Sequence, residues 1–375
     1  MLLLDEKATQ MDDLLDKMAA AVQLDQSRYV RMKQHYEAVK NWIEADEKFF
    51  KPYKYDVYPH GSVRILTTVK PFGRDEFDLD IAIHLKAELS SHTPQRIYTE
   101  LKRRLQEHDT YKAMLEPKSR CLRLNYTGDF HMDILPGVQE HHWDENKLMV
   151  PDHDLGGWVS SNPRGYANWF LDTTNKVEMS LIEKALRAEK IPADDYEQKK
   201  PLQRAVQLIK RYRDIYFQKD DTYKTSSIIL TTIAGQFYTG QESIFDTVEH
   251  IVTTLQSKIA GISSRIKIVN PVNADEDFTD KWEREPQHYK AFQAFTLHLH
   301  QEWQKLKRNR GVITEGTIMK GLFGEQVFIK AQTDQSNFIE NLRKNKQLAV
   351  NKSTGTLSSL SSTAAVIKTN TFFGE

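Results

Sequence analysis

The run FDLDIAIHL at residues 77–85 constrains the fold of this chain more than any other segment. Apolar and polar residues alternate along it, a period that is typical of a β-strand with one face in a core. Asp78 and Asp80 then lie side by side on the face opposite Phe77 and Leu79. Like charges at this spacing repel, and a fold tolerates them most easily when a cation lies between them. The alternative is the solvated polar face of an edge strand.

A glycine–serine pair precedes this strand. The strand-like YDVYP is followed by His60, Gly61 and Ser62 and then by VRILTTV, which predicts a helix with Ser62 as its cap. Glycine lets the backbone approach a phosphate closely, while the serine hydroxyl and helix-terminal amides donate hydrogen bonds. Gly-Ser alone is a common turn pair, so it indicates a phosphate site only together with the carboxylates that follow.

A third carboxylate follows the strand. CLRLNY and FHMDIL flank the turn residues TGD, which predicts a hairpin whose second strand places Asp133 on the face opposite Met132 and Ile134. Asp133 can then reach the first two carboxylates across neighbouring strands. Three carboxylates from two strands are what two Mg²⁺ ions need to clamp both oxygens of an in-line phosphoryl displacement. We therefore expect Asp78, Asp80 and Asp133 to be catalytic residues and ligands of two Mg²⁺ ions.

The hydrophobic pattern divides the chain of 375 residues into two lobes and two terminal segments. Residues 11–49 show helical spacing and predict one long amphipathic helix, or two joined end to end. Residues 53–135 form short alternating runs with a helical stretch at 96–107, which indicates a mixed α/β unit. Helical patterns return at 166–171, 180–189 and 202–217. The predicted parts are an N-terminal helix (1–50), an α/β core (51–180), a helical lobe (181–345) and a flexible tail (346–375).

Charge and cysteine content exclude several classes of function. Lys plus Arg and Asp plus Glu both total 52, so the strong positive field that holds long nucleic acid is missing and any phosphate site must be local. A single cysteine, Cys121, excludes an internal disulfide and a multi-thiolate zinc site, and we interpret it as a small core residue. His141 and His142 are interpreted as surface or loop histidines. No apolar run approaches membrane-spanning length, which favours a cytoplasmic protein without a membrane partner.

The order Gly-Ser, short helix, Asp-x-Asp and a distant Asp resembles the polymerase-beta-like nucleotidyltransferases. The segments HGSVRILTTVKPFGRDEFDLDIAIHL, FHMDILPG, KPLQRAVQLIKRYRD, TSSIILTTIAG and NPVNADEDFTDKW are similar to the bacterial cGAS/DncV-like nucleotidyltransferases (CD-NTases). The resemblance extends from residue 53 to residue 282. It implies an α/β (α+β) fold, in which a polymerase-beta-like core with a mixed sheet packs against a C-terminal helical lobe and an N-terminal spine helix.

The resemblance also assigns substrate contacts. It implies that Gly61 and Ser62 hold the donor triphosphate and that Lys210 contacts it from the second lobe, with Ser226 or Ser227 beside it. Lys210 follows the buried stripe of the predicted helix 202–217, where a lysine stem rests on the core and its amine reaches a cleft. A solvated lysine is the alternative reading.

Two further segments carry open alternatives. The resemblance suggests that NPVNADEDFTDKW edges the nucleotide pocket, whereas Asp275, Glu276 and Asp277 also fit helix-start acids. The Ser/Thr-rich tail ends in TFFGE at 371–375, which fits either a docking handle or a frayed terminus. In the resembled family, a companion regulatory or conjugating protein acts on some C-termini, and the near-terminal glycine fits that partner.

The resemblance implies a Mg²⁺-dependent enzyme that condenses nucleoside triphosphates, including ATP, into a cyclic di- or trinucleotide second messenger for bacterial antiphage signalling. One alternative is addition of nucleotides to an RNA 3′ end, which requires a basic track that zero net charge disfavours. The other is a nucleic-acid-binding sensor or scaffold. A binder of phosphates gains nothing from three clustered carboxylates, so the sequence favours the enzyme.

Overall fold

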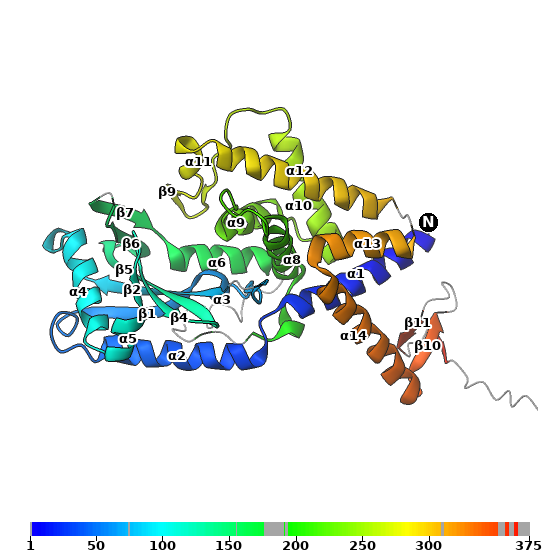
Figure 1. Ribbon diagram of the computed structural model, residues 1–375, viewed down its shortest axis with the longest axis horizontal. Helices are drawn as coiled ribbons and strands as arrows, with labels where there is room; N and C mark the ends of the chain where they lie inside the picture. Colours follow the sequence, from blue (N-terminus) through cyan, green and yellow to red (C-terminus); the bar gives the residue numbers. More distant parts are fainter. Residues whose placement is uncertain are drawn as a thin grey trace, which may run out of the picture.

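The computed structural model of the protein describes residues 2–73, 76–154, 156–175, 191, 194–308, 311–351, 357–359 and 364–366. These residues form a part built on a β-sheet and a part built of helices (Figure 1). Their buried apolar side chains divide in the same way, with one cluster around the sheet and another among the helices. A cavity lined by residues of both parts lies where they meet.

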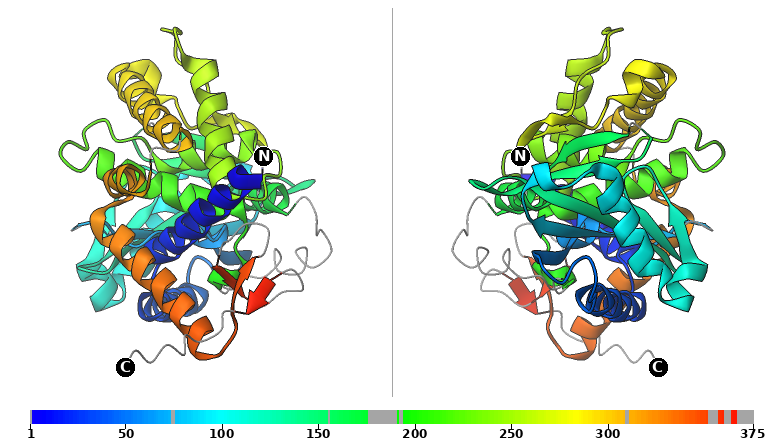
Figure 2. Two further views of the ribbon diagram at one scale, coloured as in Figure 1. Left: turned by 90° about the vertical axis from the view of Figure 1, so that its right-hand side faces the viewer. Right: turned by 90° about the vertical axis from the view of Figure 1, so that its left-hand side faces the viewer.

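Two helices at the start of the chain connect these parts. α1 (Leu2–Val22) packs in the helical part beside α14, and α2 (Gln26–Glu44) packs on the sheet (Figures 1 and 2). Asp25 separates them, because its side chain accepts a hydrogen bond from the amide of Arg28 at 2.9 Å and caps α2. Of the two alternatives for residues 11–49, two helices joined end to end is therefore the right one.

The sheet of the first part is mixed, as predicted. β1 (Lys54–His60), β2 (Phe77–Lys86), β5 (Phe130–His141), β4 (Leu122–Tyr126) and β3 (Leu115–Pro117) lie side by side in that order. β6 (Asp144–Asp152) pairs with β5, and β7 (Gly157–Ser161) pairs with β6. β2 and β5 run parallel, whereas the other pairs are antiparallel. The predicted hairpin is confirmed as β4 and β5.

Different helices pack on the two faces of the sheet. The alternate apolar residues of β2, from Leu79 to Leu85, are buried against α2 and α4 (Pro94–Gln106), which confirms the predicted helix at 96–107. α5 (Asp109–Met114) follows α4. The opposite face carries Asp78 and Asp80 and meets α6 (Pro163–Thr174) and the helical part. The strand period therefore directs the carboxylates toward the second lobe.

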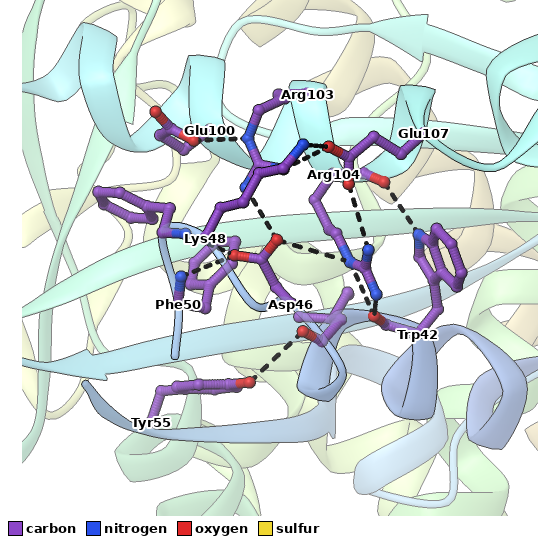
Figure 3. A network of polar contacts seen from close by, with 11 residues as sticks. Trp42, Asp46, Lys48, Phe50, Tyr55, Glu100, Arg103, Arg104 and Glu107 are labelled. Atoms are coloured by element: carbon purple, nitrogen blue, oxygen red, sulfur yellow. Dashed lines mark hydrogen bonds and ion pairs between the residues drawn. The ribbon is translucent and has the colours of Figure 1, made fainter. Parts of the chain in front are cut away.

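A polar network ties α2 to α4 on the apolar side of the sheet (Figure 3). Asp46, just after α2, accepts hydrogen bonds from the amide of Phe50 at 2.8 Å and from the guanidinium of Arg103 at 2.9 Å. The indole of Trp42 donates to the carbonyl oxygen of Arg104 at 2.9 Å, and Nε of Arg104 donates to the carbonyl oxygen of Trp42 at 2.9 Å. These bonds fix the ends of the two helices against each other.

The helical part is centred on α8, the predicted helix at 202–217. Its apolar stripe, including Leu202, Val206 and Ile209, is buried. The elements from α8 onward are α8 (Pro201–Tyr216), α9 (Ser227–Phe237), α10 (Ile244–Ile259), α11 (Lys281–Arg284), α12 (Gln287–Lys307), α13 (Val312–Phe323) and α14 (Glu325–Lys344), with a small ribbon of β8 (Val269–Asn270) and β9 (Asn273–Asp277).

The predicted helix at 180–189 lies outside the described residues. In the predicted tail, β10 (Leu348–Asn351), β11 (Leu357–Ser359) and β12 (Ala364–Val366) form a small antiparallel sheet, while the TFFGE motif at 371–375 lies outside the described residues. The flexibility of the tail stays a prediction. Within the described ranges, no helix is both long and apolar enough to span a lipid bilayer.

Candidate active site

The side chains of the candidate site form one row across four adjacent strands. His60 of β1 is paired with Asp80 of β2, Asp80 with Asp133 of β5, and Asp133 with Arg123 of β4. Residues paired across neighbouring strands point to the same face of a sheet. The register therefore places two of the three predicted carboxylates side by side, and Asp78 lies two residues from Asp80 on the same face.

Burial and neighbouring charges shift the pKa of two of these carboxylates. Burial raises the pKa of Asp80 well above its usual value, and the negative charges of Asp78 and Asp133 raise it further, whereas Lys210 and Arg123 oppose the shift. Burial and the charge of Asp133 also raise the pKa of Asp78, although Arg123 opposes this. No described residue donates a hydrogen bond to Asp80. A bound cation would relieve the repulsion among the three carboxylates.

Gly61 is required by the position of Asp80. It begins the short helix α3 (Gly61–Arg64) with a φ of 59°, a conformation that side chains with a Cβ rarely adopt. A Cβ atom there would lie 2.0 Å from Oδ2 of Asp80, far inside van der Waals contact. The glycine thus lets the backbone and the carboxylate approach each other.

Ser62 follows in the first turn of α3 and lines the cavity. Its Oγ lies 3.1 Å from Oγ1 of Thr68. The prediction that Ser62 caps this helix is wrong, because β1 continues through His60, which takes the capping position, and the turn begins directly at Gly61. Burial lowers the pKa of His60 to about 4, so its imidazole is neutral at neutral pH.

Arg123 is the site residue that sequence reasoning missed. Its Nε and NH2 donate to the two carboxylate oxygens of Asp133 at 2.7 and 2.8 Å, and NH2 lies 3.3 Å from Oδ1 of Asp78. His131 of β5 is paired with Asp78 of β2, and its Nε2 lies 2.9 Å from Oε2 of Glu76. The alternation in CLRLNY places Arg123 on the polar face, but only the strand register shows that it faces Asp133.

Cations from the helical lobe form the opposite wall of the cavity. Lys210 and Arg213 project from α8, and Lys224 joins them from the segment before α9. Arg213 donates to Oδ1 of Asp214 at 2.6 Å, and Nζ of Lys224 lies 3.1 Å from the same oxygen. A local basic surface therefore faces the carboxylates although the chain has no net charge.

Lys210 is almost fully buried, with 3% of its surface exposed, so the alternative of a solvated lysine is wrong. Nζ donates to the carbonyl oxygen of Thr67 at 3.2 Å and to its Oγ1 at 3.0 Å. Burial, aided by the charge of Arg213, lowers the pKa of Lys210 to about 7. An anion that enters the cavity would form a charge-assisted hydrogen bond with this buried amine and stabilise its protonated form.

The two predicted serines differ in position. Ser227, the first residue of α9, lines the cavity and accepts a hydrogen bond from Arg213. Ser226 precedes it as the capping residue and is not among the cavity-lining residues. The assignment of a triphosphate contact to either serine stays a prediction, and the geometry favours Ser227.

The three acids of the segment after residue 270 have separate surroundings. They lie on β9, so the helix-start interpretation is wrong, because α11 begins later and is capped by Asp280. Glu276 lines the cavity and accepts from Oγ of Ser161 at 2.9 Å. Asp275 is 3.1 Å from Nζ of Lys147, and Asp277 is bound to Thr279 and Arg265. Only Glu276 therefore edges the pocket.

The two adjacent histidines, His141 and His142, lie apart from this site. His141 stacks on Trp143 at the tip between β5 and β6, and His142 lies 2.6 Å from Glu88, with most of its side chain exposed. Both are surface histidines, as predicted. Cys121, predicted as a core residue, is only partly buried; burial raises the pKa of its thiol, and the charges of nearby Asp133 and Asp80 raise it further.

The cavity has a volume of about 930 Å³. Its carboxylates fit Mg²⁺ in donor chemistry, since Mg²⁺ binds carboxylate oxygens, and no described residue donates a hydrogen bond to Asp80. Within the described residues, no three carboxylate, histidine or cysteine side chains converge on one point that could hold an ion. In this arrangement the guanidinium of Arg123 is bound to Asp133 and contacts Asp78.

Comparisons with known proteins identify the relatives of this chain. Residues 9–175 match the Second Messenger Oligonucleotide or Dinucleotide Synthetase domain. A c-di-GMP synthase of Roseivirga ehrenbergii is 44% identical over 347 residues, covering 92% of each chain. The cyclic dinucleotide synthase CdnG of Bradyrhizobium diazoefficiens is 24% identical over 355 residues, covering 87% of this chain and 83% of that one.

Solved structures show the same fold. The Bradyrhizobium diazoefficiens CD-NTase CdnG in complex with GTP has a TM-score of 0.69 at 21% identity, covering 87% of this chain and 99% of that chain. The Vibrio cholerae DncV cyclic AMP-GMP synthase in complex with the linear intermediate 5′ pppA(3′,5′)pG has a TM-score of 0.56 at 14% identity, covering 87% and 88%. The predicted fold class is confirmed.

Proposed function

This chain belongs to the family of cGAS/DncV-like nucleotidyltransferases, and we propose that it joins two nucleoside triphosphates, GTP among them, into a cyclic dinucleotide second messenger. The observation that carries the proposal is the pairing of Asp80 with Asp133 beneath a cavity whose opposite wall is cationic. A triphosphate complements such a wall, and its reacting end then lies over the carboxylates.

Each part of the cavity has a role in this reaction. Gly61 and Ser62 hold the donor triphosphate on the sheet side, and Lys210 binds it from α8. Asp78, Asp80 and Asp133 would hold two Mg²⁺ ions, which when bound neutralise phosphate charge and lower the pKa of the acceptor hydroxyl. Asp133 also orients that hydroxyl and accepts its proton.

Arg123 has a separate role in the proposed mechanism. Its guanidinium neutralises Asp133 and part of Asp78 while no substrate is bound, at N–O distances of 2.7 to 3.3 Å. Two neighbouring carboxylates repel each other, so this contact stabilises their arrangement. When a triphosphate enters, its oxygens offer Arg123 a new bidentate partner and free the carboxylates.

Guanine as the base is supported by the c-di-GMP synthase that shares 44% of its residues with this chain. ATP as a further substrate, a role in antiphage signalling and attachment of a companion protein through the tail stay predictions. The products of one reaction distinguish these bases, because cyclic dinucleotides of guanine, adenine or both differ in mass.

Incubation of the purified enzyme with all four ribonucleoside triphosphates and Mg²⁺, followed by mass spectrometry, tests the proposal. We expect a cyclic dinucleotide that contains guanine and no product from Asp133→Asn. Nucleotides added to an RNA oligonucleotide in a parallel reaction, without any cyclic product, would instead establish the RNA 3′-end alternative. An enzyme that binds triphosphates but forms no phosphodiester bond would refute both.

A further inference from the structure

Residues 65–70 form a strap that leads away from the Gly61–Ser62 turn and contains no helix or strand longer than a single bridge. On one side, the amide of Lys70 donates to the carbonyl oxygen of Val22 at 2.9 Å, and Val69 forms an isolated β-bridge with Gln23. The strap is therefore attached to the junction between α1 and α2.

On its other side the strap is held by side chains of α8. Nε2 of Gln203 donates to the carbonyl oxygen of Ile65 at 3.0 Å, and Nε2 of Gln207 donates to that of Thr68 at 2.8 Å. The guanidinium of Arg211 donates to the carbonyl oxygen of Lys70 at 2.8 Å. Lys210 adds the bond to Thr67 described above. Four bonds thus join one helix to four carbonyl groups within six residues of chain.

The spacing of the donors explains this arrangement. Positions 203, 207, 210 and 211 follow the i, i+4, i+7, i+8 pattern that places side chains on one face of a helix. All four donors are buried, with 0–3% of their surface exposed. A face with this periodicity is normally apolar, but here it is polar and matched to backbone carbonyls. We name this set, Gln203, Gln207, Lys210 and Arg211, the α8 ladder.

The strap is bound in turn to the phosphate-binding turn. The amide of Thr67 donates to the carbonyl oxygen of Ser62 at 2.9 Å, and Thr68 Oγ1 lies 3.1 Å from Ser62 Oγ. Gly61, next to Ser62, touches the carboxylate of Asp80. A displacement of the strap therefore moves the serine hydroxyl and the glycine backbone relative to the metal-binding carboxylates.

We propose that Gln203, Gln207 and Arg211 are positioning residues, which hold the strap so that Gly61 and Ser62 are placed for triphosphate binding. The proposal deepens the proposed function and depends on it for the triphosphate. Apolar residues would be sufficient to bury this face of α8. The proposal therefore explains why the face carries polar side chains instead.

The test compares two variants of α8 that each remove one buried hydrogen bond to a backbone carbonyl. Gln207→Met keeps the length of the side chain and removes the bond to Thr68. Tyr212→Phe removes the bond from Tyr212 Oη to the carbonyl oxygen of Phe295, at 3.2 Å, and also the contact of the same hydroxyl with Nδ1 of His298, at 2.7 Å. None of these three residues lines the cavity. The readouts are amide hydrogen exchange of residues 61–70 and affinity for a non-hydrolysable GTP analogue with Mg²⁺.

We expect Gln207→Met to accelerate exchange in the strap and to weaken binding of the analogue about tenfold, which corresponds to the loss of one buried hydrogen bond. Tyr212→Phe should leave both readouts near the parent values at a similar loss of thermal stability. If Gln207→Met does not fold, Arg211→Met takes its place, and Arg211→Lys should restore part of the affinity because it keeps a donor.

The outcomes separate the two proposals. Unchanged strap exchange in Gln207→Met or Arg211→Met would refute the ladder, whatever the enzyme synthesises. Faster exchange with unchanged affinity would show that the strap does not position the turn. Equal effects of Gln207→Met and Tyr212→Phe on affinity would indicate a general structural role and also refute it. A parent enzyme that binds no triphosphate would refute the proposed function, and with it the role of the ladder in binding.

Discussion

Asp46 and Asp80 are carboxylates of the same part of the molecule that have both lost much of their water, yet their pKa values move in opposite directions. Burial raises both. At Asp46, the amide of Phe50 and the guanidinium of Arg103 more than offset burial, and the pKa falls below its usual value (Figure 3). At Asp80, neighbouring Asp78 and Asp133 add to burial instead.

The difference separates a structural carboxylate from a functional one. The chain satisfies Asp46 with donors of its own, so this side chain joins α2 to α4 and needs nothing further. It leaves Asp80 without a described donor and places a second carboxylate next to it in the sheet. A carboxylate without a donor at a cavity is available to an external partner, and a divalent cation is the partner that the proposed function requires.

Removal of the two β2 carboxylates should have the largest effect on activity. We expect Asp78→Ala combined with Asp80→Ala to reduce product formation by on the order of a thousandfold or more, because the metal ligands act as a unit. The midpoint of thermal unfolding without metal should stay equal or rise, since a repulsive pair is removed. Product assays and thermal scans measure both. Ordinary nucleotide incorporation by the double mutant would end the two-metal proposal.

Removal of Asp46, the carboxylate with donors of its own, should lower stability and leave activity unchanged. Asp46→Ala leaves two buried backbone amides without an acceptor and removes one of the three carboxylates that bind Arg103, and we expect the free energy of unfolding to fall by about 2–4 kcal/mol. Activity per folded molecule should be retained. Asp129→Ala is the matched control, because Asp129 pairs with Arg31 at the surface and should cost less than about 1 kcal/mol. Urea unfolding distinguishes the two, and equal losses would contradict the contrast.

The pH dependence of stability should have opposite signs at the two positions. The folded pKa of Asp80 lies above the usual value for an aspartate, so the stability from this group is full below that usual value and is lost as pH rises through the folded pKa. The folded pKa of Asp46 lies below the usual value, so its contribution is present above that value and is lost as pH falls through the folded pKa. Metal-free urea unfolding from about pH 3 to pH 8, with Asp80→Asn and Asp46→Asn beside the parent, measures both. Parallel curves would contradict the assignments.

Lys210 extends the comparison to a buried cation, with a smaller expected effect. Lys210→Ala should raise KM for GTP about tenfold and change kcat less, since a contact to the ground-state triphosphate acts as uniform binding. Because its pKa is about 7, KM of the parent should also rise as pH passes neutrality and the amine loses its proton. Steady-state kinetics across this pH range provide the check. Equal KM values for variant and parent would contradict the assignment of Lys210 to triphosphate binding.

The sequence predicted the carboxylates of the site because a strand period is local. Alternation in β2 and in β5 is sufficient to place Asp78, Asp80 and Asp133 on polar faces. It does not say which strands are neighbours. The parallel pairing of β2 with β5 joins segments about fifty residues apart and brings Asp80 beside Asp133, and the pairing of β4 with β5 adds Arg123 to the row.

The Asp46 network escaped sequence reasoning for a similar reason. Asp46 lies in a turn without periodicity, and its partner Arg103 is 57 residues away on α4. The polar ladder on α8 was also missed, because only the apolar stripe of that helix carries a sequence signal. The prediction that Ser62 caps α3 was wrong by the position of one helix start. Gly61, with its positive φ, begins the helix and is not distinguished from a turn glycine by sequence.

The position of α1 has a consequence for synthesis of the chain. α1 leaves the ribosome long before its packing partners α8 and α14, which lie at residues 201–216 and 325–344. Leu15, Met18 and Val22, fully buried in the finished protein, therefore stay partly uncovered until both of these helices have been made. Contacts between segments so far apart in sequence slow folding and leave apolar surface exposed to aggregation. In a nascent chain of this protein, α1 is thus a segment that a chaperone would need to cover.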